Sequence, residues 1–311
     1  MSKNRSNPIL LSYCPHGLNE NIYYPIEKDD EVKELNDLKT HLFGENKIDF
    51  TIFFNSRNIR RKQIPDTMFA FKIFLDTLPK EKANKCAMIL HTEIVSDHGT
   101  NLEIVRKMLF SDYPNAILFS TNKLDNKQLN QLYNIADVQI LLTSNEGWGL
   151  SLTEAMLAGT PIIANVTGGM QDQMRFEDNY GEWFTPTPEL PSNHTGAFKN
   201  HGVWAFPVFP SNRSLQGSPK TPYIWDDRCN AEDAALRISE VYDLDKETRD
   251  FLGKQGRYWA LNEAGFTSAI MGERVILAID QLFNTWIPRE KYELINVNDV
   301  KEDIINHKLV Y

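Results

Sequence analysis

Cysteine is scarce in this sequence, and no long apolar run is present. The three cysteines, Cys14, Cys86 and Cys229, are odd in number and far apart, so they fit neither a disulfide framework nor a zinc site. We therefore expect reduced thiols in a cytoplasmic protein. No apolar run approaches the roughly 20 residues that cross a bilayer, so we expect no transmembrane segment. The apolar run near the N-terminus is also too short for a good signal peptide.

Positive charge is in deficit as well. The formal net charge is −9, which argues against a broad surface for nucleic acid or for an anionic membrane. An anionic ligand must therefore be held by a local cluster of cations. The apolar fraction of 41% and the charged fraction of 24% are those of an ordinary globular protein. A length of 311 residues allows one large domain or two small ones.

Short apolar runs alternate with amphipathic stretches between about residues 48 and 184. This alternation predicts an α/β fold, in which a parallel sheet carries helices on both faces. The predicted strands are 50–54, 86–91, 116–120, 138–142 and 161–165, and the predicted helices are 66–78, 101–110, 125–134 and 150–158. Gly159, followed closely by Pro161, marks the end of the last of these helices.

Residues from about 185 to 228 break the alternation. They are rich in Pro, Gly, Ser and Asn and predict an irregular insertion with one short strand at 203–209. Two interpretations of its aromatic residues stay open: they pin a loop to the core, or they form a binding surface for an acceptor or a partner. These residues are Trp204, Phe206, Phe209, Tyr223 and Trp225.

Helical periodicity returns from about 231 to 286 and predicts C-terminal helices. The tail from residue 288 is polar and mixed, and its pattern predicts no element. The core positions predicted in the C-terminal helices are Leu236, Ile238, Val241, Phe251, Ile270, Val275, Ile276 and Ile279.

Two glutamates eight positions apart mark the most informative segment, residues 143–164. Glu146 is predicted in a loop after a strand, and Glu154 is predicted in the helix that follows. Carboxylates accept hydrogen bonds from sugar hydroxyls. The amides of residues 149–151 open the helix and are free to donate to an anion, and Gly147 and Gly149 let a ligand approach the backbone. Each acid also has a plainer interpretation: Glu146 is an exposed loop acid, and Glu154 complements the helix dipole.

A basic turn follows the first predicted strand. It contains four basic residues in six positions: Arg57, Arg60, Arg61 and Lys62. Arginine binds phosphate oxygens with two parallel hydrogen bonds, and lysine adds a point charge. Because ligands of parallel sheets bind beyond the carboxyl ends of the strands, we expect this turn to meet the two glutamates there. The alternative is a solvated turn with no ligand.

Paired glycines, Gly168 and Gly169, follow the last predicted strand. They form an ordinary turn or place backbone amides towards a ligand. Other motifs are missing: Leu152 stands where a dinucleotide fingerprint needs its third glycine. His91 and His98 lack the spacing of metal ligands. We therefore expect no metal site.

The glutamate segment resembles the donor-site signature of retaining GT-B glycosyltransferases, in particular family four with its E-x7-E motif. The family core E-G-F-G-L-x-x-x-E reads EGWGLSLTE here, with Trp148 in place of Phe. Arg57 and Lys62 keep the spacing of the family's G-R-L-x-x-x-K-G, although Ser56 and Gln63 replace both glycines. Residues 15–18 and 24–25 resemble the linker that enters the family's C-terminal domain.

The resemblance implies a site for a nucleotide-diphosphate sugar, such as a UDP- or GDP-sugar, that is transferred with retention of anomeric configuration. Arg57 and Lys62 would hold the diphosphate, Glu154 the ribose, and Glu146 the transferred sugar. The family needs no metal, and we expect no cofactor. The resemblance implies that the catalytic residues are Glu146, Arg57 and Lys62. It implies that the residues that bind the nucleotide sugar are Glu154, Gly149, Leu150, Ser151, Gly147, Asn145 and Leu124, and that the nucleotide base lies near residues 119–124.

The resemblance also bears on domain organisation. It implies a linker-like lead-in over 1–47 and a Rossmann-like donor domain over 48–311. GT-B enzymes have a second, N-terminal domain for the acceptor, which residues 1–47 are too few to build. We expect that half to lie on a longer chain or on a separate N-terminal acceptor-domain chain. The acceptor, whether saccharide, lipid or protein, stays open. The alternative function is a non-catalytic module that binds a nucleotide sugar or a partner.

Overall fold

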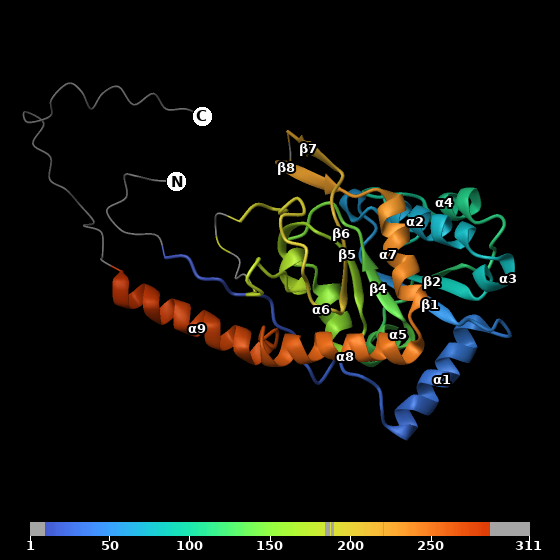
Figure 1. Cartoon of the computed structure of the whole chain (residues 1–311), viewed down its shortest axis with the longest axis horizontal. Helices are drawn as coiled ribbons and strands as arrows, with labels where there is room; N and C mark the ends of the chain where they lie inside the picture. Colours follow the sequence, from blue (N-terminus) through green and yellow to red (C-terminus); the bar gives the residue numbers. More distant parts are fainter. Residues whose placement is uncertain (1–9, 184–186, 188–189, 220, 287–311) are drawn as a thin grey trace, which may run out of the picture. The chain divides into compact units, whose positions relative to one another are not determined.

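The computed structural model describes residues 10–183, 187, 190–219 and 221–286, which fall into two compact units (Figure 1). The larger unit, 13–273, contains the sheet and most helices. The described part of the second unit is residues 10–12 and 274–286, the latter mainly the end of α9 (Ser268–Thr285). The tail from residue 288 lies outside the described residues, as do residues 1–9 of the predicted lead-in.

A six-stranded parallel sheet forms the centre of the larger unit. Its strand order is β3-β2-β1-β4-β5-β6, so the order reverses between β1 and β4, where open α/β sheets have their binding crevice. The first five strands match the predicted ones to within a residue at most ends, which confirms the α/β fold. The strands are β1 (Phe50–Asn55), β2 (Cys86–His91), β3 (Ile117–Ser120), β4 (Val138–Leu141), β5 (Ile162–Asn165) and β6 (Ala205–Val208).

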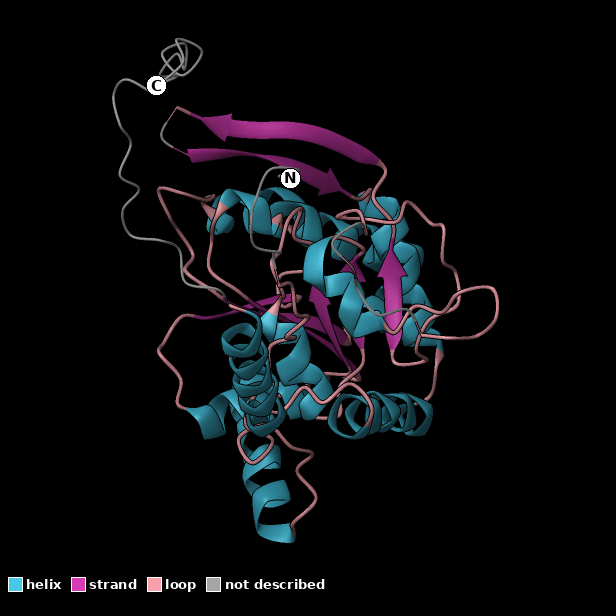
Figure 2. Ribbon diagram, turned by 90° about the vertical axis from the view of Figure 1, so that its left-hand side faces the viewer, coloured by secondary structure: helices cyan, strands magenta, loops and turns pink. Residues whose placement is uncertain are grey.

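Helices cover both faces of this sheet (Figure 2). Helices α2, α4 and α7 pack together on one face, and α1, α5, α6 and α8 form the layer on the other. Residues 50–54 of β1 are therefore buried on both sides, which explains why that strand reads as an unbroken apolar run. The helices are α1 (Asp29–Phe43), α2 (Ile64–Thr77), α3 (Lys80–Ala83), α4 (Leu102–Leu109), α5 (Asn126–Ile135), α6 (Leu150–Leu157), α7 (Ala231–Asp243) and α8 (Lys246–Asn262), with 3-10 turns η1 (Arg60–Lys62) and η2 (Gly168–Met174).

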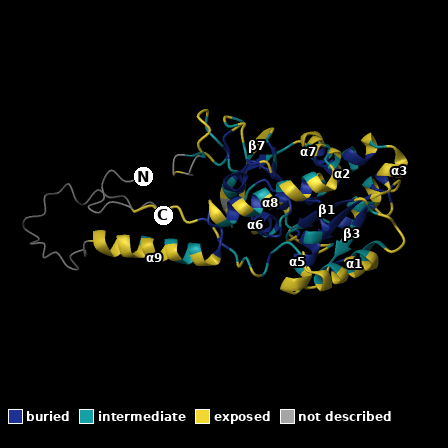
Figure 3. Ribbon diagram, turned by 60° about the horizontal axis from the view of Figure 1, so that its bottom comes forward, coloured by how far each residue is buried: buried dark blue, intermediate teal, exposed yellow. Residues whose placement is uncertain are grey.

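Helix α1 lies inside the segment that the sequence analysis assigned to the lead-in. Its sequence, DDEVKELNDLKTHLF, buries only Leu35, and Figure 3 shows the helix mostly in the colours of exposed and intermediate residues. Leu35, Leu38 and Leu42 recur at helical spacing, and the last two pack partly buried against the core. The sequence analysis assigned this segment to the lead-in and did not predict the helix.

The predicted insertion is more regular than its composition indicated. The expected short strand is β6, which joins the edge of the main sheet beside β5. The residues after it form an antiparallel hairpin of β7 (Asn212–Ser218) and β8 (Thr221–Arg228), which was not predicted. Trp204 is 4% exposed and belongs to the core, as the first interpretation requires, whereas Tyr223 and Trp225 on the hairpin are exposed.

Several predicted core positions of the C-terminal helices are wrong. Ile238 and Val241 are buried, but Leu236 and Phe251 are each 58% exposed. Helix α8 instead packs through Gly253 and Gly256, and a Cβ on Gly253 would lie 1.8 Å from the carbonyl oxygen of Gly159. Trp259, which is 2% exposed, is the large apolar residue of the buried face, and it was not among the predicted core positions. Ile270 is half-buried, and Val275, Ile276 and Ile279 are exposed. No helix within the described residues is both long and apolar enough to pass through a membrane.

Candidate functional site

A cavity of about 650 Å³ lies at the carboxyl ends of β1 to β4. It is lined by residues at or just after the ends of four strands. The reversal of strand order therefore brings side chains from distant parts of the sequence together at the carboxyl ends of the strands. The lining residues are His16, Asn55, Ser56, Arg57, Lys62, His91, Thr92, Glu93, Ser120, Thr121, Asn122, Lys123, Glu146, Gly147, Trp148, Gly149, Leu150, Ser151 and Glu154.

The structure brings most of the predicted site residues to this cavity. They are Arg57, Lys62, Glu146, Gly147, Gly149, Leu150, Ser151 and Glu154. It does not bring Asn145 or Leu124 to the lining. Asn145 donates a hydrogen bond to the carbonyl oxygen of Trp225 at 3.4 Å, and Leu124 packs against the core. Residues 120–123, within the segment predicted to lie near the base, do line the cavity.

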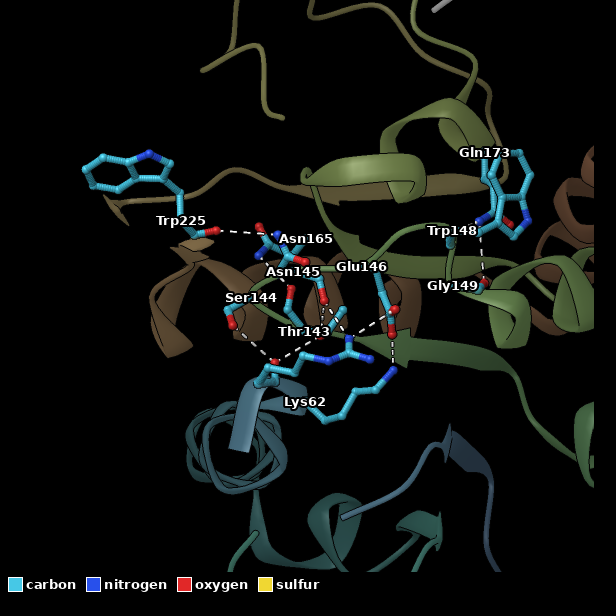
Figure 4. Close-up of polar contacts among 11 residues, drawn as sticks. Lys62, Thr143, Ser144, Asn145, Glu146, Trp148, Gly149, Asn165, Gln173 and Trp225 are labelled. Atoms are coloured by element: carbon cyan, nitrogen blue, oxygen red, sulfur yellow. Dashed lines mark hydrogen bonds and ion pairs between the residues drawn. The ribbon is translucent and has the colours of Figure 1, made fainter. Parts of the chain in front are cut away.

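Glu146 forms ion pairs with two residues of the basic turn (Figure 4). Its Oε1 pairs with Lys62 Nζ, and its Oε2 lies 3.0 Å from Arg61 Nη1. The same Arg61 nitrogen donates to the carbonyl oxygen of Asn145 at 2.6 Å. Glu146 is therefore a paired and largely buried carboxylate, not the exposed loop acid of the plainer interpretation. Sequence reasoning did not assign this role to Arg61, because the four basic residues of the turn looked equivalent.

The four cations of the turn differ in their surroundings. Arg57 lines the cavity, and its guanidinium has no hydrogen bond or ion pair among the described residues, so it is free to meet an anion. Arg60 turns away and donates to the Gln216 side chain at 2.9 Å. Lys62 is 9% exposed, and burial lowers its pKa to about 8, with the Arg61 charge adding to the effect.

The basic turn is fixed to the strand end that leads to Glu146. The carbonyl oxygen of Arg61 accepts hydrogen bonds from the Ser144 amide at 2.8 Å and the Thr143 hydroxyl at 2.9 Å. Gln63 takes a left-handed conformation, with φ 51°, between η1 and α2. The turn and the glutamate loop therefore form one connected unit.

Glu154 is held from three sides. Its Oε2 accepts hydrogen bonds from Tyr133 Oη at 2.5 Å and from Asn55 Nδ2 at 3.2 Å, and Tyr23 adds a third. Burial raises the pKa of Glu154, and these three hydrogen bonds oppose that rise. The first turn of α6 contains no acidic residue, so the helix-dipole interpretation of Glu154 does not apply. Tyr133, Asn55 and Tyr23 were not predicted.

Trp148 fixes the loop between the two glutamates. Its Nε1 donates to Thr153 Oγ1 at 2.9 Å, and Thr153 donates to Gln173 Oε1 at 2.7 Å. Gln173 Nε2 returns a hydrogen bond to the Trp148 carbonyl oxygen at 2.6 Å. Gly149 adopts φ 87°, a conformation that favours glycine, and its turn begins α6. The closed ring of buried hydrogen bonds makes this loop rigid.

The glycine pair packs against the back of the same loop. A Cβ on Gly168 would lie 1.9 Å from the carbonyl oxygen of Glu146, and one on Gly169 would lie 2.2 Å from that of Gly147. The Gly169 amide donates to the Glu146 carbonyl oxygen at 3.2 Å. The pair therefore supports the glutamate loop and does not line the cavity.

No group of three or more His, Cys, Asp or Glu that could hold a metal ion occurs within the described residues. His91 Nδ1 lies 3.0 Å from both the carbonyl and the hydroxyl oxygen of Ser120, and burial lowers its pKa. The polar groups around the cavity suit an anion and hydroxyl groups: cations and helix amides can donate to the anion, and carboxylates can accept from the hydroxyls.

Two comparisons with known proteins match part of the chain. Residues 94–189 match the family described as glycosyl transferases group 1. An uncharacterized glycosyltransferase of Methanocaldococcus jannaschii is 31% identical over 99 residues, which are 32% of this chain and 24% of that protein. Both matches cover about a third of the chain, and they show that this part is similar to the group 1 glycosyltransferases. The resemblance seen in the donor-site motif is confirmed at that level.

Solved structures show the same fold over most of the chain. Sucrose-phosphate synthase from Thermosynechococcus elongatus has a TM-score of 0.57 at 20% identity, over 87% of this chain and 52% of that one. Anabaena HepE, solved in complex with UDP and glucose, has a TM-score of 0.57 at 16% identity, over 86% of this chain and 55% of that one. The chain spans about half the length of these proteins.

Proposed function

We propose that the cavity at the carboxyl ends of β1 to β4 binds the donor of a retaining glycosyl transfer, a nucleotide-diphosphate sugar. The observation that carries the proposal is the convergence of Arg57 and Lys62 with Glu146 and Glu154 at one cavity. The family match supports it. The complex of Anabaena HepE with UDP-glucose makes UDP the first nucleotide to test.

The diphosphate would lie between the basic turn and the start of α6. Arg57 supplies an unpaired guanidinium, and Lys62 supplies a buried ammonium. The amides of Gly149, Leu150 and Ser151 donate to no acceptor among the described residues, so they are free for phosphate oxygens. Cations and helix amides aimed at the leaving diphosphate stabilise the charge that develops as the glycosidic bond to phosphate breaks. This is the role that a metal ion has in other transferases, and we propose that no metal is needed here.

The two glutamates would hold the two sugars of the donor. Glu154 offers one oxygen to the ribose hydroxyls, because its other oxygen is held by Tyr133 and Asn55. Glu146 would bind hydroxyls of the transferred sugar. It lies against Lys62, so a diphosphate on Lys62 would compete for that ammonium and release the carboxylate for the sugar. We propose retention of anomeric configuration and a hexose as the transferred group.

Lys62→Ala and Arg57→Ala should each weaken UDP binding by about tenfold or more while leaving uridine binding unchanged, because each removes a charge-assisted hydrogen bond of about 1.5–3 kcal/mol to phosphate. Calorimetry with UDP, GDP, ADP and uridine measures this. Arg60→Ala is the matched control, since Arg60 is in the same turn but contacts Gln216. Equal losses for UDP and uridine would refute the phosphate role, and no binding of any nucleotide at millimolar concentration would refute the donor site.

UDP affinity should fall as the pH rises through about 8. Burial lowers the pKa of Lys62 to that value, so the ammonium is charged below it and becomes neutral above it. Binding an anion then requires a proton, and the affinity falls by up to about tenfold per pH unit. Calorimetry between about pH 7 and about pH 9.5 gives the profile. In Lys62→Arg the guanidinium stays charged over this range, so a profile with the same slope in that variant would contradict the assignment.

The second candidate function is binding without turnover. It is favoured by one observation, that the chain spans about half the length of the solved relatives. Incubation of the chain with UDP-glucose separates the two functions: release of UDP, by hydrolysis or by transfer to an added saccharide, indicates catalysis. Tight binding with no UDP released indicates a module that works with a separate acceptor domain.

A further inference from the structure

A second cavity, of about 430 Å³, lies at the amino ends of the strands, opposite the candidate donor site. It is lined by the end of α1, by residues 46–51 that lead into β1, by Asp137 just before β4, and by Lys246, the first residue of α8. These are the amino ends of the strands, whereas the candidate donor site lies at the carboxyl ends. Its volume is within the range of small-molecule sites.

Three lysines meet at this cavity: Lys39, Lys47 and Lys246. The ammonium groups of Lys39 and Lys47 have no ion pair or hydrogen bond among the described residues, and that of Lys246 pairs with Asp250 one turn along α8. Lys39 is half-buried, and burial together with the Lys246 charge lowers its pKa, against the opposing charges of Asp137 and Asp250. Unpaired cations that repel one another are unexpected in a protein of net charge −9.

The acids at the cavity are already satisfied. Asp137 lies 3.1 Å from Arg249 Nη2 and accepts a hydrogen bond from the Thr51 amide at 2.8 Å. Asp49 forms an ion pair with Lys85 at 3.2 Å. Neither carboxylate forms an ion pair with Lys39 or Lys47, although the charge of Asp137 still acts on Lys39. The balance of free charge in the cavity is positive.

We propose that this cavity binds a phosphate-bearing small molecule, held by the ammonium groups of Lys39, Lys47 and Lys246. Lysine is a point-charge ligand for phosphate. The start of α8 is already capped, because the Thr248 amide donates to Asp245 Oδ1 at 2.7 Å, so the three lysines carry the proposal. The site is independent of the proposed donor site and shares no lining residue with it.

Inorganic pyrophosphate, without divalent metal, is the probe. It is titrated into the full chain carrying Arg57→Ala and Lys62→Ala, so that the cations of the donor cavity are absent. Calorimetry gives the affinity, and backbone amide NMR locates the ligand. We expect binding with shifts at residues 43–51 and 246–248. Absence of binding, or shifts confined to the carboxyl ends of the strands, overturns the proposal.

Matched substitutions on α1 then test the lysines. In the same background, Lys39→Met should weaken pyrophosphate binding by about tenfold, the value of one charge-assisted hydrogen bond. Lys33→Met, on the same helix but outside the cavity lining, should leave it unchanged. Lys246→Met is a second variant in case Lys39→Met folds poorly, and Lys39→Arg should restore binding. Equal effects of Lys33→Met and Lys39→Met would show a general charge effect and overturn the site.

Discussion

Replacing Glu154 with glutamine should weaken UDP binding by about a hundredfold. The carboxylate of Glu154 is buried, and one of its oxygens is already occupied by Tyr133 and Asn55. Two ribose hydroxyls that donate to this charged group would contribute about 3 kcal/mol together, which corresponds to that factor. Glutamine has nearly the same size, so the cavity stays filled, but its uncharged amide is a weaker acceptor. Calorimetry with UDP measures the loss.

The ligand supplies the control for this substitution. A 2′,3′-dideoxy form of UDP lacks the two hydroxyls, so it should bind wild-type protein weakly and bind Glu154→Gln with almost the same affinity. Pyrophosphate affinity for the donor cavity should also be unchanged, because Arg57 and Lys62 are intact. If UDP and its dideoxy form lose affinity equally, Glu154 acts through the hydrogen bonds to Tyr133 and Asn55, and the ribose assignment fails.

The sequence predicted the sheet well because its signal is local. Residues 50–54 and 86–90 are buried on both faces, and strands of this kind read as continuous apolar runs whatever surrounds them. Elements with a narrow apolar face gave a weaker signal. Helix α1 fully buries only Leu35, and α8 packs through Gly253 and Gly256 beside a single large apolar residue, Trp259. Their positions depend on tertiary packing, which a window of sequence does not contain.

In the candidate site, too, the residues with a local sequence signal were predicted and those that depend on tertiary packing were not. Arg57, Lys62, Glu146 and Glu154 carry a motif with fixed spacing, and the structure places all four at one cavity. The residues that hold them in position were missed, because their roles depend on contacts between distant segments. Tyr133 reaches Glu154 from α5, whereas a tyrosine in an amphipathic helix predicts only a core position.

Gly168→Ala should have the largest effect on stability, lowering the free energy of unfolding by about 3 kcal/mol. Two costs add. An L-residue at φ +53° is strained by roughly 1–2 kcal/mol, and a Cβ would lie 1.9 Å from the carbonyl oxygen of Glu146, an overpacking that typically costs about 1–3 kcal/mol. The clash is with backbone, so the glutamate loop must move. We therefore expect weaker UDP binding at temperatures where the variant is still folded.

Two other glycines separate the costs. Gly181 has φ +79° and open space around its Cβ position, so Gly181→Ala carries the strain alone and should cost about 1 kcal/mol without changing UDP affinity. Gly169 has no positive φ, but its Cβ would lie 2.2 Å from the Gly147 carbonyl oxygen, so Gly169→Ala carries the clash alone and should weaken UDP binding. Urea denaturation and calorimetry measure both quantities. If Gly168→Ala lowers stability no more than Gly181→Ala, or leaves UDP affinity intact, the glycine pair does not support the glutamate loop.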